Sequence, residues 1–376
     1  MALSLREIIA GYNPNAPLTE ASTPPALWYI EPRVFDLEKR TVFSHSWQMF
    51  GRADQVREPG QYMTGEIAGE PILVVRGNDG VLRGFFNVCR HHAAAVVTNS
   101  EGITQTLRCP YHGWIYNLEG ALVVTPEFGD VRKFDRSLNR LIPIEAAVWK
   151  NWVLVKLDPS GLSLEDFLSK DLIGQIERLE LDKLYWTERR SYTMACNWKV
   201  FIDNYLDGGY HVPHIHGGLG SVLDHTNYTI ETGNRFCLQS SPIQSDKGEQ
   251  QTAAVRKGNR ALYYWVYPNF MINWYEGVMD TNLVRPLGVD QTEVIFDFYF
   301  ADTSDTARER NLASIAVSER IQTEDKSICE SVQCGLKSRA YTAGRLSVRR
   351  EAGEHLFHRL LYTDLNTDPS DENPLT

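Results

Sequence analysis

The sequence lacks any run of about 18 consecutive apolar residues, so it predicts no transmembrane helix. It is also short of positive charge, because 38 Lys and Arg against 48 Asp and Glu give a formal net charge of −10. An acidic balance disfavours binding to nucleic acid or to an anionic membrane. Residues 1–12 lack the charged start, apolar middle and small-residue cleavage site of a signal peptide. We therefore expect a cytoplasmic protein with neither a nucleic-acid nor a membrane partner.

Cysteine is scarce, with six residues among 376. In a large cytoplasmic chain such cysteines are more often metal ligands or buried thiols than disulfide partners. Two of them, Cys89 and Cys109, stand beside histidines and are candidate ligands. The other four show no such pattern and are expected to be small buried side chains: Cys196, Cys237, Cys329 and Cys334.

The chain is long enough for two domains and divides by pattern into three parts. Residues 1–44 form a proline-punctuated segment that we expect to pack on the last part. Residues 45–158 carry short apolar runs and turn signals, and predict an all-β domain. Residues 159–376 mix helices and strands, so the predicted fold class is α+β. The elements expected in this last part are helices at Leu164–Leu181 and Arg308–Leu336 and strands within Ala261–Tyr275 and Thr292–Phe300.

The all-β part contains two Cys/His pairs, Cys89-Arg90-His91 and Cys109-Pro110-Tyr111-His112. Two thiolates and two imidazoles on paired loops can hold either one zinc ion or a [2Fe–2S] cluster. A zinc finger usually takes both cysteines from one loop and both histidines from a helix, whereas each loop here supplies one of each. The following Gly113 permits a tight loop. The pattern favours the cluster.

A second group of candidate ligands follows in the sequence NWKVFIDNYLDGGYHVPHIH at 197–216. If its first part is a helix, Val200, Asn204, Asp207 and His211 share one face. Pro213 should end that helix near Val212 and let His216 fold back toward His211. His214 lies between the two histidines and stays open as a competing ligand.

The predicted helix at Arg308–Leu336 adds a carboxylate to these histidines. Asp325 falls at helical spacing with Ile321, Ile328 and Val332, in the middle of an apolar stripe. A buried carboxylate needs a cation or strong hydrogen-bond donors. Glu324 falls on another face, which suits solvent. Two histidines and one carboxylate form the facial triad that holds Fe(II) in non-haem oxygenases.

Together the two boxes and the triad resemble the α subunit of the Rieske non-haem iron oxygenases, over essentially the whole chain. The resemblance implies an all-β Rieske domain and a catalytic domain of helix-grip type, an antiparallel sheet with helices. It implies a [2Fe–2S] cluster, a mononuclear Fe(II) and O₂ as co-substrate. Electrons would come from NAD(P)H through a separate reductase or ferredoxin, and the subunits would form a head-to-tail homotrimer. The ligands implied are Cys89, His91, Cys109 and His112 for the cluster and His211, His216 and Asp325 for the iron.

Many members of this family carry an acidic residue three positions before the first histidine ligand, which bridges the two metal centres across a subunit boundary. Here that position is Gly208. We assign the bridge to Asp207 because it shares the expected helical face of His211, and Asp203 stays open as the alternative. Asn204 should lie near the iron.

The stretch DNYLDGGYHVP is most similar to the choline monooxygenase branch of the family, which implies hydroxylation of a C–H bond in a quaternary ammonium substrate. Seven aromatics are dense nearby, and alternate ones could face a cation: Tyr263, Tyr264, Trp265, Tyr267, Phe270, Trp274 and Tyr275. We expect Tyr264, Tyr267, Phe270 and Trp274 to form the cage, with Glu276 as counter-charge. The same residues are also what the core of a strand pair would contain.

Two other functions stay open at this point. An oxygenase on the same scaffold could act on an aromatic acid, for which Arg285 is the candidate anion partner. The chain could also be a non-catalytic Rieske electron carrier, whose second site would be coincidental.

Overall fold

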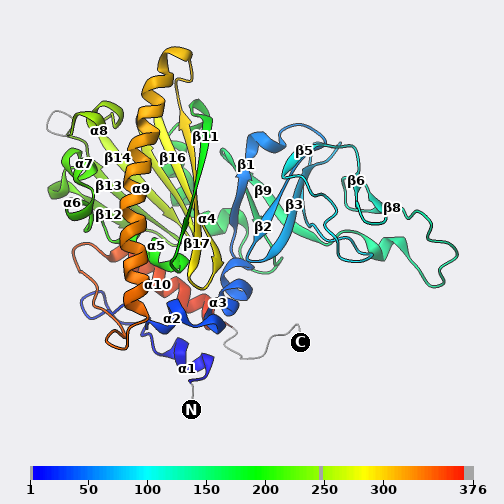
Figure 1. Cartoon of the computed structure of the whole chain (residues 1–376), viewed down its shortest axis with the longest axis horizontal. Coiled ribbons are helices and arrows are strands. Elements are labelled where there is room, and N and C mark those ends of the chain that lie inside the picture. Colours follow the sequence, from blue (N-terminus) through cyan, green and yellow to red (C-terminus); the bar gives the residue numbers. More distant parts are fainter. Residues whose placement is uncertain (1–2, 245–248, 368–376) are drawn as a thin grey trace. The chain divides into compact units, whose positions relative to one another are not determined.

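The chain divides into two units, one formed by Met1–Val42 with Glu165–Thr376 and the other by Phe43–Leu164. The computed structural model describes residues 3–244 and 249–367 (Figure 1). The second unit extends past the expected end at 158 because Trp47 and Lys156 both donate side-chain hydrogen bonds to the carbonyl oxygen of Leu162. Within the described residues, no helix combines the length and the apolar character needed to cross a lipid bilayer.

The unit Phe43–Leu164 is built from two antiparallel sheets, as the turn signals predict. Gly80 and Gly120 adopt positive φ angles of 77° and 80° in tight turns between paired strands. The larger sheet has the order β1-β10-β9-β4-β3-β2-β5. Its strands are β1 (Gln48–Arg52), β2 (Gln61–Ile67), β3 (Glu70–Arg76), β4 (Leu82–Phe86), β5 (Glu101–Ile103), β9 (Pro143–Trp149) and β10 (Trp152–Lys156). The smaller sheet joins β6 (Leu107–Arg108), β7 (Ile115–Tyr116) and β8 (Leu122–Val124).

The other unit is organised around one seven-stranded antiparallel sheet of order β11-β17-β16-β15-β14-β13-β12. The expected helix-grip arrangement is confirmed, since helices cover this sheet (Figure 1). The expected strand region 261–275 is a hairpin of two strands. The strands are β11 (Tyr185–Met194), β12 (Thr229–Thr232), β13 (Phe236–Pro242), β14 (Arg260–Val266), β15 (Phe270–Tyr275), β16 (Val278–Gly288) and β17 (Gln291–Phe300).

The long helix α9 (Arg308–Leu336) has the predicted bounds and lies across the sheet in Figure 1, and it contacts α5 (Trp198–Leu206). Asn197 caps α5 by accepting a hydrogen bond from the amide of Lys199. The C-terminal α10 (Ala352–Leu365) packs against α5. The remaining helices are α1 (Leu5–Ala10), α2 (Leu27–Ile30), α3 (Pro32–Glu38), α4 (Leu164–Glu177), α6 (Val212–Ile215), α7 (Gly217–Val222) and α8 (Gln250–Val255).

The N-terminal helices join α5 through a buried polar contact. Glu38 at the end of α3 accepts hydrogen bonds from the ammonium of Lys199 and the indole of Trp198, and all three side chains are buried. A buried ion pair is costly to break because either partner alone would remain as an unpaired charge.

The buried face of α9 differs from the predicted apolar stripe. Asp325 is buried as expected, but Val332 is exposed, whereas Gln322 and Cys329 are buried. The buried face of α9 contains polar side chains as well as apolar ones. Hydrophobic spacing alone therefore predicted only part of this face.

Candidate active site

The two Cys/His pairs lie on two loops with the same backbone design. In the first, the amide of Ala93 bonds to the carbonyl of Cys89, and the amide of Cys89 to the carbonyl of Ala94. In the second, Gly113 and Trp114 make the same two bonds with Cys109. Ala93 and Gly113 both have positive φ, 60° and 70°. The prediction that Gly113 permits a tight loop is confirmed, and Ala93 adopts the equivalent conformation despite its Cβ.

The side chains of these loops converge. The rings of His91 and His112 lie 4.7 Å apart, and His91 stacks on Trp114 at 4.6 Å. Cys89 and Cys109 are buried and not in a disulfide. His91 Nδ1 is buried without a hydrogen-bond partner, which leaves a free lone pair for a metal. Burial and the neighbouring His92 and His112 lower the pKa of His91, which favours the neutral imidazole that ligation requires.

One further side chain touches this site. The hydroxyl of Tyr116 accepts a hydrogen bond from the amide of Arg90 at 3.0 Å and lies 3.4 Å from Cys89 Sγ. A cluster-bound thiolate has no proton, so in the cluster-containing protein the Tyr116 hydroxyl would be the donor to this sulfur. Hydrogen bonds to cluster sulfurs tune the reduction potential. The residues therefore fit a [2Fe–2S] cluster, with buried thiols on one side and the exposed His112 on the other.

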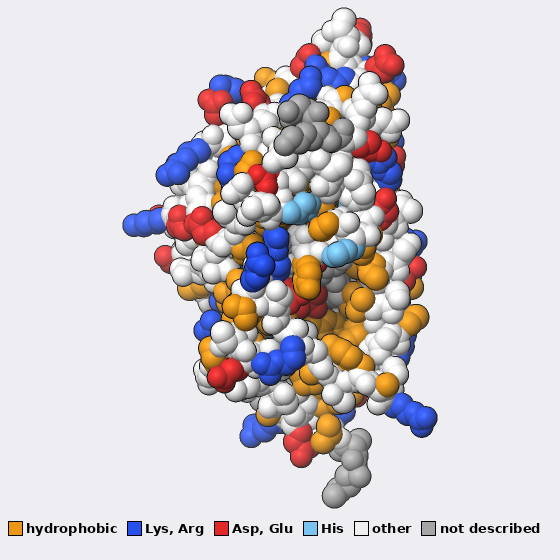
Figure 2. Space-filling view, turned by 90° about the vertical axis from the view of Figure 1, so that its left-hand side faces the viewer, with side chains coloured by type: hydrophobic (Ala, Val, Ile, Leu, Met, Phe, Trp, Pro, Cys, Tyr) orange, Lys and Arg blue, Asp and Glu red, His pale blue; other side chains and the backbone are white. Residues whose placement is uncertain are grey.

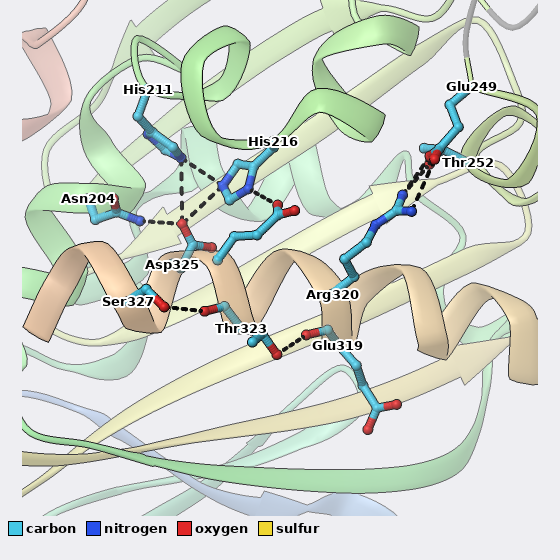
Figure 3. A network of polar contacts seen from close by, with 11 residues as sticks. Asn204, His211, His216, Glu249, Thr252, Glu319, Arg320, Thr323, Asp325 and Ser327 are labelled. Carbon is cyan, nitrogen blue, oxygen red and sulfur yellow. Dashed lines mark hydrogen bonds and ion pairs between the residues drawn. The ribbon is translucent and has the colours of Figure 1, made fainter.

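The second site brings together two histidines and a carboxylate from distant parts of the sequence (Figure 3). His216 Nε2 lies 3.1 Å from His211 Nε2 and 3.0 Å from Asp325 Oδ1. His211 Nε2 lies 3.7 Å from the same oxygen. Three ligand atoms thus point at one place, and Asn204 donates to Asp325 Oδ1 at 2.8 Å. The set fits a mononuclear iron, and Asn204 lies beside it as predicted.

The backbone that carries the histidines differs from the predicted single helix. Helix α5 ends at Leu206, before Asp207 and His211. Gly208 and Gly209 follow with φ of 68° and 66°, and Pro213 stands in the first turn of the separate helix α6 rather than ending the previous one. A Cβ added to Gly208 would lie 2.1 Å from the carbonyl oxygen of Arg350. An acidic side chain therefore does not fit at this position.

Each histidine is oriented by a second carboxylate through its other ring nitrogen. Asp207 Oδ2 accepts from the backbone amide of His211 at 2.9 Å and lies 2.7 Å from His211 Nδ1. Glu324 Oε2 lies 2.6 Å from His216 Nδ1. Such partners hold Nδ1 as the donor and leave Nε2 free for a metal. Burial disfavours a charged His216, but Asp325 and Glu324 outweigh burial and raise its pKa in the metal-free chain.

Glu324 is the residue that sequence reasoning missed here. Glu324 was predicted to face solvent, because helical spacing puts it on the same side of the helix as Arg320. The long side chain nevertheless reaches His216 beside its neighbour Asp325. Helical spacing locates Cα atoms and does not report where a flexible side chain ends, so adjacency to Asp325 was the only available signal.

The structure also bears on two alternatives that the sequence left open, His214 as a metal ligand and Asp203 as the bridging carboxylate. His214 is exposed and lies outside the group formed by His211, His216 and Asp325. Asp203 accepts from the hydroxyl of Tyr29 at 2.7 Å and lies 2.9 Å from His358 Nε2. Its position next to Asn204 on α5 turns it away from the iron ligands, because successive helical residues point about 100° apart. The bridge stays a prediction for Asp207, which contacts His211, with Asp203 as the alternative.

A cavity of about 110 Å³ adjoins the three ligand atoms. That volume is several times what one water molecule requires. Apolar side chains form one part of its wall, and tyrosines and buried polar groups form another. The residues used below are Leu219, Leu223 and Ile321 for the apolar part and Tyr205, Tyr228, Tyr263, Tyr275, Arg256, Asp280 and Asn282 for the polar part. Seen from the side of α6 to α8, histidine and hydrophobic side chains reach the surface together (Figure 2).

The predicted cage residues Tyr264, Tyr267, Phe270, Trp274 and Glu276 do not line this cavity. In the β14–β15 pair, Tyr263 is opposite Asn273 and Tyr264 is opposite Ile272. Paired residues share a face and successive ones alternate, so the Tyr263 face meets the cavity and the Tyr264 face does not. The inward face could not be read from Tyr263, Tyr264 and Trp265, because consecutive aromatics occupy both faces of the strand.

The remaining four predicted cage residues are excluded by position. Trp274 pairs with Leu262, on the Tyr264 face. Tyr267 follows β14 and donates from its hydroxyl to Asp364 at 2.6 Å. Phe270 pairs with Val266, on the Tyr264 face. Glu276 is exposed in the turn between β15 and β16. Of the seven aromatics in the predicted run, Tyr263 and Tyr275 line the cavity, and their hydroxyls lie 2.8 Å apart.

Apart from Asp325, the charged residues that line the cavity were not predicted. Arg285, the expected anion partner, forms an ion pair with Glu293 and does not line the cavity. Arg256 and Asp280 do. A signal for Asp280 existed, since Asp280 and Asn282 stand at alternate positions of β16 and so share one face of the sheet. Arg256 follows the short α8, whose sequence shows no distinctive pattern.

Comparison with known proteins identifies the two domains in which these sites lie. Residues 46–135 match the Rieske [2Fe-2S] domain, and residues 181–364 match the ring hydroxylating alpha subunit (catalytic domain). The chain is 39% identical over 372 residues to choline monooxygenase, chloroplastic, of Arabidopsis thaliana, covering 96% of this chain and 87% of that protein. It is 32% identical over 360 residues to the carnitine monooxygenase oxygenase subunit of Escherichia coli K12, covering 91% and 93%.

A solved structure is similar over the same extent. It is a quaternary ammonium Rieske monooxygenase, described in terms of carnitine oxidation by gut microbiota and inter-subunit electron transfer. The TM-score is 0.81 at 26% identity, with 96% of this chain and 99% of that chain covered.

Proposed function

Because this chain belongs to the Rieske-type ring-hydroxylating oxygenase family, whose members use a [2Fe–2S] cluster, a mononuclear iron and O₂, we propose that it hydroxylates a C–H bond of a small quaternary ammonium compound. The observation that carries the substrate class is the cavity beside His211, His216 and Asp325. Its wall combines tyrosine rings with the buried carboxylate of Asp280. Aromatic faces and a buried carboxylate both favour a cation, and attraction to an aromatic face requires no hydrogen-bond donor on that cation.

We assign the cluster to Cys89, His91, Cys109 and His112 and the iron to His211, His216 and Asp325. When bound, the cluster supplies single electrons and the iron activates O₂. Asp207 and Glu324 hold the two imidazoles in the tautomer that presents Nε2. Asn204 engages Asp325 Oδ1 and so limits how that carboxylate can rotate.

Electrons in this proposal come from NAD(P)H through a separate reductase or ferredoxin, and the working form is a homotrimer. Asp207 is the proposed link to the cluster of a neighbouring subunit. It already contacts His211 Nδ1, and its carboxylate remains partly exposed. The exposed ring of His112 is suited to contact with an electron-transfer partner. The similar enzyme described for inter-subunit electron transfer supports this arrangement.

The cavity favours a choline-like compound over an aromatic acid that would rely on Arg285, because Arg285 pairs with Glu293 outside the cavity. A purely electron-carrying role would not account for the convergence of His211, His216 and Asp325. That convergence comes from segments more than a hundred residues apart, as the 109-residue separation of His216 and Asp325 shows.

The test is a substrate screen on the iron-loaded protein with a surrogate reductase and NADH. Substrate-dependent O₂ uptake and product mass are followed for choline, carnitine, glycine betaine and benzoate. We expect at least one quaternary ammonium compound to be oxidised with O₂ uptake matched to product. Oxidation of benzoate alone would contradict the substrate class and leave the oxygenase assignment in place.

A further inference from the structure

We propose that the cavity binds a compact zwitterion, with Arg256 holding an anionic group of the substrate and Asp280 facing its quaternary ammonium. This inference rests on the proposed function and deepens it, because choline lacks an anionic group and a betaine carries one. It follows from two buried charges in one cavity wall that are not paired with each other.

Arg256 carries a positive charge that only neutral groups contact. Its side chain is 2% exposed, and its Nη1 and Nη2 atoms donate to the hydroxyls of Ser314 and Ser318, each at 2.7 Å. Its guanidinium lies 4.7 Å from the centre of the Tyr275 ring. Its Nε is buried without a hydrogen-bond partner. In the described part of the chain, no carboxylate lies within ion-pairing distance of Arg256.

Asp280 carries the opposite charge under similar conditions. It is 3% exposed and accepts from Asn273 Nδ2 at 2.7 Å and from the Ser318 hydroxyl at 3.4 Å. No Lys, Arg or His among the described residues forms an ion pair with it. Burial raises its pKa, and the more distant Arg256 partly offsets that effect. The neighbouring Asn282 has a buried Nδ2 atom without a hydrogen-bond partner.

The charges of Arg256 and Asp280 and the amide of Asn282 define what the cavity can stabilise. An isolated buried charge is unfavourable, and a buried donor without an acceptor adds to the cost. A simple cation would satisfy Asp280 but would lie beside the uncompensated guanidinium of Arg256. A simple anion would meet Arg256 and Asn282 but be repelled by Asp280. A ligand with both charges compensates both side chains.

The spacing of the two charges limits the length of the ligand. Ser318 contacts both Arg256 and Asp280, so one hydroxyl spans the distance between them. The two charged groups of the ligand should accordingly be separated by only a few bonds. The apolar part of the wall, with Leu219, Leu223 and Ile321, is then available to the methyl groups of the ammonium.

The experiment measures binding by calorimetry to the iron-loaded, cluster-containing protein, using glycine betaine, choline and benzoate at one ionic strength. Glycine betaine and choline share the trimethylammonium group and differ in the carboxylate. We expect wild type to bind glycine betaine at least about tenfold more tightly than choline, since a charge-assisted bidentate pair adds at least that much. Arg256→Gln should remove most of that preference, and Arg256→Lys should keep part of it.

Arg320→Gln is the matched control. Arg320 lies on the same helix as Ser318 and pairs with Glu249 next to α8, but it does not line the cavity. Its loss should leave the affinity for glycine betaine unchanged. Cluster absorbance and the unfolding temperature show whether each variant is folded. If Arg256→Gln does not fold, the wild-type ratio and Arg256→Lys decide the question.

The outcomes separate this inference from the proposed function. Choline bound as tightly as glycine betaine, or equal losses for both in Arg256→Gln, would overturn the zwitterion and leave a quaternary ammonium oxygenase. Binding of benzoate with neither ammonium compound would overturn both. A glycine betaine preference that depends on Arg256 would support both.

Discussion

The two metal-binding regions of this protein are constructed in different ways. In the all-β unit, each loop supplies one cysteine and one histidine within four residues, and its shape comes from backbone hydrogen bonds within that loop. In the other unit, His211 and His216 meet Asp325 from a helix about a hundred residues further along, and each imidazole depends on an additional carboxylate. A site encoded locally can be recognised from a motif, whereas a site assembled by packing shows only fragments of its pattern.

The largest expected effect comes from removing one ligand of each site. Cys109→Ser should abolish the [2Fe–2S] spectrum and leave about one iron atom per chain. Asp325→Ala should keep the spectrum and leave about two iron atoms per chain. Both should lose oxygenase activity by about a thousandfold or more. Iron analysis and visible absorbance distinguish the two. Loss of both centres in either variant would show that the units do not bind metal independently.

A smaller effect is expected for Glu324→Gln, which keeps the size of the side chain and removes its charge. Weaker orientation of His216 should lower iron affinity or kcat by about 10- to 100-fold with the cluster spectrum unchanged. Iron titration and steady-state turnover measure it. Glu309→Gln, at an exposed position in the first turn of the same helix, is the control and should have no effect. Equal behaviour of the two variants would remove Glu324 from the site.

The smallest effect concerns the aromatic wall. Tyr263→Leu should raise KM for the quaternary ammonium substrate by about 3- to 30-fold, because it removes a π face worth about 0.5–2 kcal/mol. Glu276→Gln should leave KM unchanged, since Glu276 is exposed in a turn away from the cavity. A raised KM in Glu276→Gln with none in Tyr263→Leu would favour the assignment made from sequence over the one made from structure.

The sequence alone was sufficient to predict the family, the fold class and the candidate ligands of both proposed sites. The Cys-x-His and Cys-x-x-His pairs are contiguous, and Gly113 marks the left-handed turn that they need. Asp325 was detectable because a carboxylate in an apolar helical stripe requires a partner. A cytoplasmic location and a trimer remain predictions.

Tertiary structure decided what depends on register, on side-chain length and on the ends of helices. It placed Tyr263 rather than Tyr264 at the cavity, because alternation in a run of aromatics has no polar residue to show which face is inward. It brought Glu324 onto His216 and ended α5 before Asp207. It also put Arg256 and Asp280 in one wall with Ser318 between them. Local patterns report the conformation of a segment, whereas substrate recognition depends on which segments the fold brings together.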